Sequence, residues 1–252
     1  MFHDLSKVEG YEPRISVVIP AYNEEGHLFV TVRGALDYLS ECGLPFELII
    51  VDDGSTDSTA AIAMQFANDS RVRMIRHAMN LGLGRSYLDG VHAARGHYVT
   101  WIPGDNAIPP EALGILLRAI GRADVIVSYP HFDMPKPFIR RVMSRSFTAL
   151  VNSLFGLRLR YFNCVTVVPR QMLGRVATAN STGFGVFAEI LILLDAAGSS
   201  MVEVEIPSVH RGIGSKAFRW RNILSVVVTF GRLWWDLRVA PRGLQGSSLK
   251  RP

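Results

Sequence analysis

The sequence predicts an α/β protein built on a doubly wound, mostly parallel sheet with helices on both faces. Short apolar, β-branched runs alternate with amphipathic stretches through the first half of the chain, in a βαβα order with short connections. The runs are apolar at successive positions, which is typical of strands buried on both faces. Several runs also end in polar residues, and parallel strands deliver such residues to the edge of the sheet where ligands bind.

The elements of the first half follow one another closely. Strands are expected at residues 15–19, 48–51, 72–75, 98–102 and 124–128. We expect Asn23 to cap the first helix, and Thr56 or Asp57 the second, because their side-chain oxygens can accept hydrogen bonds from a first turn. Pro109 and Pro110 open the helix after the fourth strand, since a first turn tolerates proline.

The pattern changes beyond residue 128, after a proline-rich break. The expected elements are a helix over residues 138–155, a helix over 184–194, a strand over 202–206 and an apolar helix over 221–240. The 138–155 helix carries an apolar face together with Arg140, Arg141 and Arg145, so it could lie on a membrane surface. An ordinary packed helix with a polar face would give the same pattern. Residues 1–12 are expected to be an extension, residues 13–220 one domain, and residues 241–252 a tail.

Length and composition exclude several classes of protein. With 252 residues and 48% hydrophobic residues, the chain can build a sizeable core, which argues against bulk disorder. No run of about 18 apolar residues predicts a transmembrane helix, and the polar N-terminus does not resemble a signal peptide. The two cysteines, Cys42 and Cys164, lie far apart, which argues against a disulfide framework or a zinc site and favours a reducing, cytoplasmic setting.

Charge is distributed unevenly along the chain. Residues 1–128 hold 10 Lys and Arg against 16 Asp and Glu, whereas residues 129–252 hold 17 against 6. A basic second half suggests an anionic partner such as a phosphate or an acidic membrane surface, although a solvated basic surface would have the same composition. Nucleic acid is not expected as a partner, because the basic half contains no recognisable reading motif.

The strand that ends at Asp52 and Asp53 is the main candidate for a site. It belongs to the run FELIIVDDGSTDST, in which a buried strand turns at Gly54 into a helix. Helix capping explains Asp57 well, but capping needs only one acid, so two adjacent carboxylates at a buried strand end favour ligand binding.

Four strand ends together resemble the family 2 glycosyltransferases, which have a GT-A fold. The segments that carry the resemblance are PAYNE, VDDGSTDST, NLGLGRS and PGDN. The resemblance implies transfer of a sugar from a GDP- or UDP-linked sugar with inversion at the anomeric carbon. The later segment HRGIGSK is similar to a loop of the dolichol-phosphate mannosyltransferase branch, which glycosylates polyprenyl phosphates, so this acceptor is the leading expectation.

The resemblance also implies roles for single residues. Those matching the family's nucleotide contacts are Pro20, Ala21, Tyr22, Glu24, Val51, Asp52, Asp53 and Gly104. The family's DxD metal motif corresponds here to Pro103-Gly104-Asp105, so Asp105 is the one carboxylate expected to bind Mg²⁺ or Mn²⁺. A hard divalent ion takes oxygen ligands, and the substrate's phosphates can supply the others.

The acceptor site departs from the family pattern. Polyprenyl-phosphate enzymes usually carry an arginine after the fifth strand, where this chain has Tyr129. The residues that could compensate are Arg140, Arg141, Arg145, Arg211 and Lys216. Glu189 could act as a base, a role needed only for a hydroxyl acceptor, as in polysaccharide or glycolipid synthesis. A non-catalytic nucleotide-sugar-binding protein is the third reading, and the leading one is a peripheral enzyme at the cytoplasmic face of the membrane.

Overall fold

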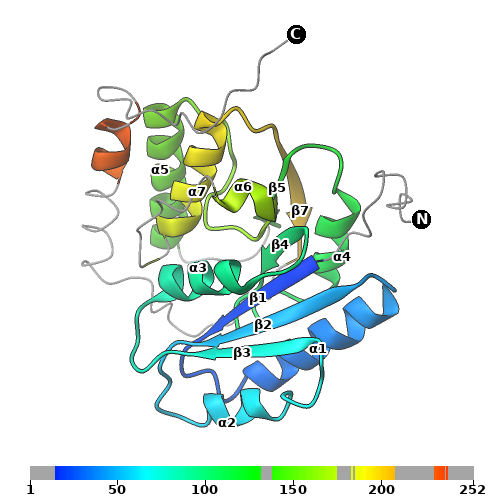
Figure 1. Ribbon diagram of the computed structural model, residues 1–252. Helices are drawn as coiled ribbons and strands as arrows, with labels where there is room; N and C mark the ends of the chain where they lie inside the picture. The colour runs from blue at the N-terminus through cyan, green and yellow to red at the C-terminus, as the bar shows by residue number, and fades with distance from the viewer. Residues whose placement is uncertain are drawn as a thin grey trace.

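The fold is a single sheet with helices packed against it (Figure 1). The computed structural model describes residues 15–131, 138–174, 183, 185–207, 230–235 and 237, and of residues 138–140 only the backbone. The strands within these residues are β1 Ile15–Ala21, β2 Phe46–Asp52, β3 Val72–Arg76, β4 Tyr98–Trp101, β5 Val125–Pro130, β6 Thr166–Pro169 and β7 Met201–Ile206. The helices are α1 Leu28–Glu41, α2 Thr59–Met64, α3 Leu83–Ala93, α4 Glu111–Arg118, α5 Phe138–Phe155, α6 Arg170–Leu173 and α7 Gly185–Ala196.

The strands lie in the order β3-β2-β1-β4-β6-β5-β7. β1, β2, β3 and β4 pair in parallel, as do β5 and β7, whereas β6 runs antiparallel to both of its neighbours. The predicted α/β class and the mostly parallel sheet are therefore confirmed. Neither β6 nor α6 was expected from the sequence, because a four-residue strand leaves too short a pattern to recognise.

The strands in the middle of the sheet bury both of their faces, whereas the edge strands β3 and β7 are mostly half-buried. On β1, Val18 faces one apolar core, which α3, α5 and α7 cover, while Val17 and Ile19 face a second core, which α1, α2 and α4 cover. Figure 1 shows α3, α5 and α7 on one side of the sheet and α1 and α2 on the other. This arrangement is the double winding predicted, and it explains why the strand sequences are apolar at successive positions.

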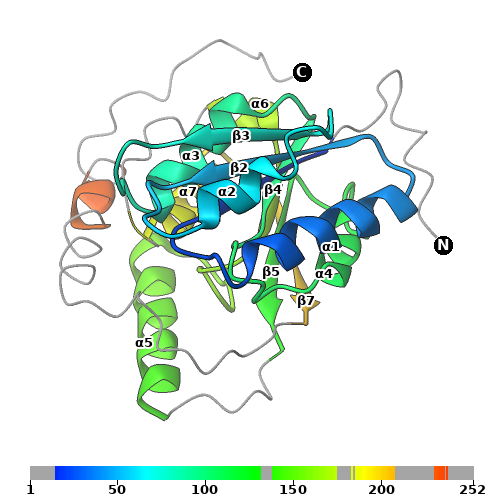
Figure 2. The ribbon, with the colours of Figure 1, turned by 90° about the horizontal axis from the view of Figure 1, so that it is seen from below.

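The second half adds α5 to the side of the sheet that α3 covers (Figure 2). The bounds expected for this helix, residues 138–155, are confirmed. Residues 230–235 are helical, and Phe230 contacts the α5 residues Phe147 and Phe155, with ring centroids 5.8 and 6.1 Å away. The rest of the apolar helix expected at 221–240, the extension at 1–12 and the tail at 241–252 lie outside the described residues. None of the described helices has the length and apolarity needed to cross a bilayer.

Candidate active site

The loops that follow β1 and β2 are joined to each other by hydrogen bonds in both directions. The Asn23 N–H donates to Ser55 Oγ at 3.0 Å, and Asn23 Oδ1 accepts from the Thr56 N–H at 2.9 Å. The prediction that Asn23 caps α1 is therefore wrong: the N-cap is His27, which makes no side-chain capping bond, and the Asn23 side chain serves the neighbouring loop instead. Asn23 also has a positive φ of 54°, which Asn tolerates better than most residues.

Two acidic side chains, Glu25 and Asp57, add hydrogen bonds between the β1 loop and the start of α2. Glu25 Oε2 accepts from the Ser58 N–H at 3.0 Å, while Asp57 accepts from the Thr59 N–H at 2.9 Å and from the Glu25 N–H at 3.3 Å. Asp57 thus acts at the start of α2, one residue before the N-cap Ser58. Slight burial would raise the pKa of the Asp57 carboxyl, but the hydrogen bonds from Thr59 and Glu25 hold that pKa below its usual value. Asp57 therefore has a structural role at the start of α2, although the N-cap residue is Ser58 and not Thr56 or Asp57 as predicted.

Asp52 is fully buried and closes the turn that follows β2. Its Oδ1 accepts from the Ser55 N–H at 3.0 Å, and its Oδ2 lies 3.2 Å from Arg76 Nε. Within this turn Gly54 has a φ of +70°, and a Cβ there would lie 2.4 Å from the carbonyl carbon of Met79. Only glycine fits, so the turn brings the loops after β2 and β3 into direct contact.

Asp53 holds the loop after β3. Its Oδ1 accepts from the Leu81 N–H at 2.9 Å and its Oδ2 from the Gly82 N–H at 2.8 Å, while the side chain is 3% exposed. His77 Nδ1 lies 2.8 Å from Asp53 Oδ1, and His77 Nε2 lies 3.1 Å from the Asp89 carboxylate on α3. The carboxylate therefore acts as an anchor for the glycine-rich segment, and a carboxylate has about four acceptor positions in all.

The end of β4 comes close to the end of β1. The Gly104 N–H donates to Pro20 O at 3.1 Å, and a Cβ on Gly104 would lie 3.0 Å from the same oxygen. The next residue, Asp105, is half-buried, and its Oδ1 accepts from the Ala107 N–H at 3.0 Å. Glycine at position 104 thus allows the loop that carries Asp105 to lie against the β1 loop.

Asp105 fits a divalent ion that is held jointly with a substrate. The described residues contain no cluster of three or more carboxylate, imidazole or thiol groups, so they form no cage made by the protein alone. Mg²⁺ and Mn²⁺ sites of the substrate-assisted kind need only one or two carboxylates, with phosphates and water as the remaining ligands. Asp105 offers such a carboxylate at the sheet edge.

The sheet brings the other predicted nucleotide contacts to the same edge. Pro20 pairs with Val51, and Ala21 with Asp52, in the parallel register of β1 and β2. Tyr22 and Glu24 follow directly in the half-buried loop. Val51 is completely buried, so a ligand could reach its backbone but not its side chain.

Only some of the residues predicted for the acceptor site lie within the described part of the chain. Arg141 and Arg145 are exposed on α5, whereas Arg211, Lys216 and the side chain of Arg140 lie outside the described residues. Glu189 is 5% exposed on α7, where nearby Phe187 stacks on Trp101 of β4 with ring centroids 4.1 Å apart. The Glu189 side chain is therefore nearly enclosed by its neighbours.

Two residues with clear roles were not singled out from the sequence. His77 is largely buried between two carboxylates, and its position just after β3 is the signal that could have identified it. Arg160 lines a pocket with Arg145, and nothing in its local sequence indicated this, because its contacts are with Tyr129 on β5 and Glu203 on β7.

Comparison with known proteins is consistent with this geometry. The family model described as "Glycosyl transferase family 2" matches residues 16–182. The chain is similar to an undecaprenyl-phosphate 4-deoxy-4-formamido-L-arabinose transferase of Pectobacterium carotovorum, with 23% identity over 84% of this chain and 65% of the relative. It is also similar to the dolichyl-phosphate beta-glucosyltransferase of Saccharomyces cerevisiae, with 32% identity over 63% of this chain and 45% of the relative. The chain thus spans less than two thirds of the length of these curated relatives.

Among solved structures, glucosyl-3-phosphoglycerate synthase from Mycobacterium tuberculosis, in complex with Mn²⁺, UDP-glucose and phosphoglyceric acid, has a similar fold. The TM-score is 0.64, with 20% identity over 87% of this chain and 80% of that chain. At this identity the likeness concerns the fold, which supports the GT-A architecture expected from the strand-end motifs.

Proposed function

Because the chain belongs to glycosyl transferase family 2, we propose that it is an inverting glycosyltransferase that moves a sugar from a GDP- or UDP-linked donor to a polyprenyl phosphate. The observation that carries the donor half is the convergence of three joined loops on the strand edge beside Asp105. These loops have few degrees of freedom left, so a nucleotide diphosphate would meet a preorganised surface.

The donor site combines two kinds of group. The Pro20–Glu24 segment and the Asp52–Asp53 turn form the surface for base and ribose, and Asp105 lies where a diphosphate would follow. A divalent ion on Asp105, Mg²⁺ or Mn²⁺, would neutralise the charge that develops on the leaving diphosphate. Two residues position the loops of this donor site. Asp53 accepts hydrogen bonds from Leu81 and Gly82, and Gly104 lets the loop with Asp105 lie against the end of β1.

The acceptor part of the proposal rests on chemistry and on the relatives' names. A phosphate acceptor is already an anion and can attack the anomeric carbon without a general base. Arg141 and Arg145 on α5 offer positive charge, while Glu189 is nearly enclosed in α7, which favours a structural role for that acid. Relatives named for undecaprenyl phosphate and dolichyl phosphate make a polyprenyl phosphate the preferred acceptor.

A lipid acceptor requires contact with a membrane surface, and we propose that α5 and residues 230–235 provide it at the cytoplasmic face. Large apolar side chains are exposed there: Val142, Met143 and Leu150 on α5, with Trp234 and Trp235 on the adjoining turn. Tryptophan and arginine together are typical of segments that lie in the interface between water and lipid.

A transfer assay tests the proposal. The protein would be incubated with a panel of radiolabelled GDP- and UDP-sugars, a polyprenyl phosphate and Mg²⁺ or Mn²⁺, and the label in the lipid fraction would be counted. We expect Arg211→Ala to reduce turnover strongly and Glu189→Gln to be tolerated, because a phosphate nucleophile needs positive charge and no base. A dead Glu189→Gln enzyme with a mild Arg211→Ala effect would instead identify a hydroxyl acceptor. Donor binding without transfer to any acceptor would make the chain a non-catalytic binding protein.

A further inference from the structure

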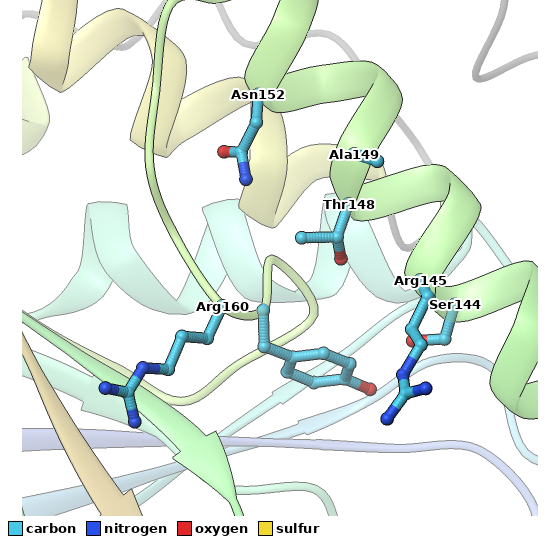
Figure 3. Close-up of a pocket in the computed structure, with 7 residues that line it drawn as sticks. Ser144, Arg145, Thr148, Ala149, Asn152 and Arg160 are labelled. Carbon is cyan, nitrogen blue, oxygen red and sulfur yellow. The ribbon is translucent and has the colours of Figure 1, made fainter.

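A pocket of about 350 Å³ lies between α5 and the segment that leads into β6 (Figure 3). The residues that line it are Ser144, Arg145, Thr148, Ala149, Asn152, Arg160 and Tyr161. Two of the seven are arginines and none is acidic. Hydroxyl groups from Ser144, Thr148 and Tyr161 add neutral hydrogen-bond donors. This combination of donors suits an anion with several acceptor oxygens.

The segment that carries Arg160 is fixed to α5. Asn152 Nδ2 donates to Leu159 O at 2.8 Å, and Asn152 Oδ1 accepts from the Leu159 N–H at 3.2 Å. This pair of bonds uses one donor and one acceptor position of the amide, so Asn152 positions the segment. Leu159 is buried, which adds an apolar anchor beside Arg160.

Arg160 is held at the end of β5. The backbone N–H of Arg160 donates to Glu203 Oε1 on β7 at 2.7 Å. The guanidinium carbon of Arg160 lies 4.7 Å from the centre of the Tyr129 ring. Arg160 Nε is 3.9 Å from Glu203 Oε2, a separation at which the remaining guanidinium N–H groups can still bind another anion. The side chain is 60% exposed, so a ligand can reach it.

The topology puts this arginine on the same edge of the sheet as Asp105. β6 is antiparallel to β5, with Val127 opposite Thr166, so the segment entering β6 arrives where β5 ends. β6 is also antiparallel to β4, which makes β4 and β5 run in the same direction. The ends of β4 and β5 are therefore on one edge, where the donor loops also lie.

We propose that Arg160 binds the phosphate group of the acceptor, with Arg145 on α5 adding positive charge to the same pocket. The inference rests on the proposed function and gives its acceptor site a specific residue. The end of β5 itself offers no arginine or lysine, because Tyr129 and Pro130 are followed by His131, which pairs with Glu205. Arg160 brings a guanidinium to this position from another segment, and the Tyr129 ring supports it from below.

Direct binding of farnesyl phosphate, a short and soluble polyprenyl phosphate, tests this role without requiring turnover. Titration calorimetry would compare wild type with Arg160→Ala, Arg160→Lys and Arg158→Ala. Arg158 is the matched control, since it is exposed two residues earlier and does not line the pocket. We expect Arg160→Ala to weaken binding about tenfold to a hundredfold, because a charge-assisted hydrogen bond is lost. Arg160→Lys should recover only part of the lost affinity for farnesyl phosphate, since lysine keeps the positive charge but lacks the planar guanidinium group.

Two further measurements separate the outcomes. Affinity for UDP and GDP should be unchanged in Arg160→Ala, because the nucleotide loops are elsewhere on the edge, and a lost nucleotide affinity would indicate a merely structural effect. Equal losses in Arg160→Ala and Arg158→Ala would overturn the inference, even if wild type transfers sugar to lipid normally. Wild type that binds glycerol phosphate through Arg160 but not farnesyl phosphate would support the phosphate site and refute the lipid acceptor. No binding of any phosphate ester by wild type would overturn the inference.

Discussion

The donor half and the acceptor half of the molecule use polar residues in different ways. In the donor half, Asn23 and Asp53 accept from backbone N–H groups of neighbouring loops and Asp52 and Asp57 from those of their own turn, through bonds of 2.8–3.0 Å. In the acceptor half, Arg141, Arg145 and Arg160 are exposed, and the segment that carries Arg160 is fixed by Asn152 and by Glu203. The first half is therefore a rigid template, whereas the second presents charge on a surface that is held at a few points.

The difference indicates a division of labour. A donor is recognised by shape and by fixed hydrogen bonds, which require loops that are ordered before binding. A lipid phosphate brings its own negative charge, and long cationic side chains can meet it without a closely fitted cavity. Substitutions in the donor half and in the acceptor half should therefore have different effects on binding and stability.

Asp105→Ala should have the largest effect. Removing the only carboxylate proposed to bind the metal should lower turnover by about a hundredfold or more, because an ion supplies several kcal/mol of charge stabilisation. A chelator should have the same effect on wild type in the lipid-transfer assay. Full activity in chelator would mean that arginines alone neutralise the diphosphate.

Asp53→Ala should weaken both folding and donor binding. Two partly buried backbone N–H groups would lose their acceptor, which costs about 1–3 kcal/mol of unfolding free energy, with a similar loss in UDP or GDP affinity. Denaturant titration and calorimetry measure the two effects. Asp37→Ala is the control, because Asp37 is exposed and pairs with Arg33 on the surface of α1. Unchanged nucleotide affinity in a destabilised Asp53→Ala protein would restrict this residue to folding.

Asn152→Ala should affect acceptor binding without affecting donor binding. Loss of its two bonds to Leu159 should cost about 1–2 kcal/mol of stability and lower farnesyl phosphate affinity, because Arg160 would no longer be positioned. UDP affinity should not change. Ser153→Ala, at the exposed neighbouring position, serves as the comparison, and an equal effect there would argue against positioning through Asn152.

Glu47 should give a small, pH-dependent effect far from both sites. Burial alone would raise its pKa, but hydrogen bonds from Ser16, the Arg95 N–H and Arg73 bring that pKa below its usual value of 4.5. A carboxyl whose folded-state pKa is lowered stabilises the fold above the unfolded pKa, and this contribution disappears as pH falls through the folded value. The stability difference between wild type and Glu47→Gln should therefore shrink below about pH 4.5. A constant difference in unfolding free energy from pH 7 to pH 3 would contradict this.

The sequence was more informative about the donor half. Its motif residues act on loops that lie next to them in space because parallel strands end side by side, so the strand-end pattern predicted the edge that gathers Asp52, Asp53 and Asp105. The prediction was wrong for Asn23, because two possible hydrogen-bond partners, the α1 turn and Thr56, compete and local sequence does not rank them. Arg160 could not be predicted, since its position depends on β6, Tyr129 and Glu203, which are far apart in the chain.

The short strand β6 has a consequence for how the protein opens. β6 aligns only two residues with β4 and two with β5, whereas β1 and β2 align seven and β5 and β7 six. Amide hydrogens along β6 should therefore exchange with solvent before those of β1 and β2, and in partial unfolding the two halves should separate as two cooperative units.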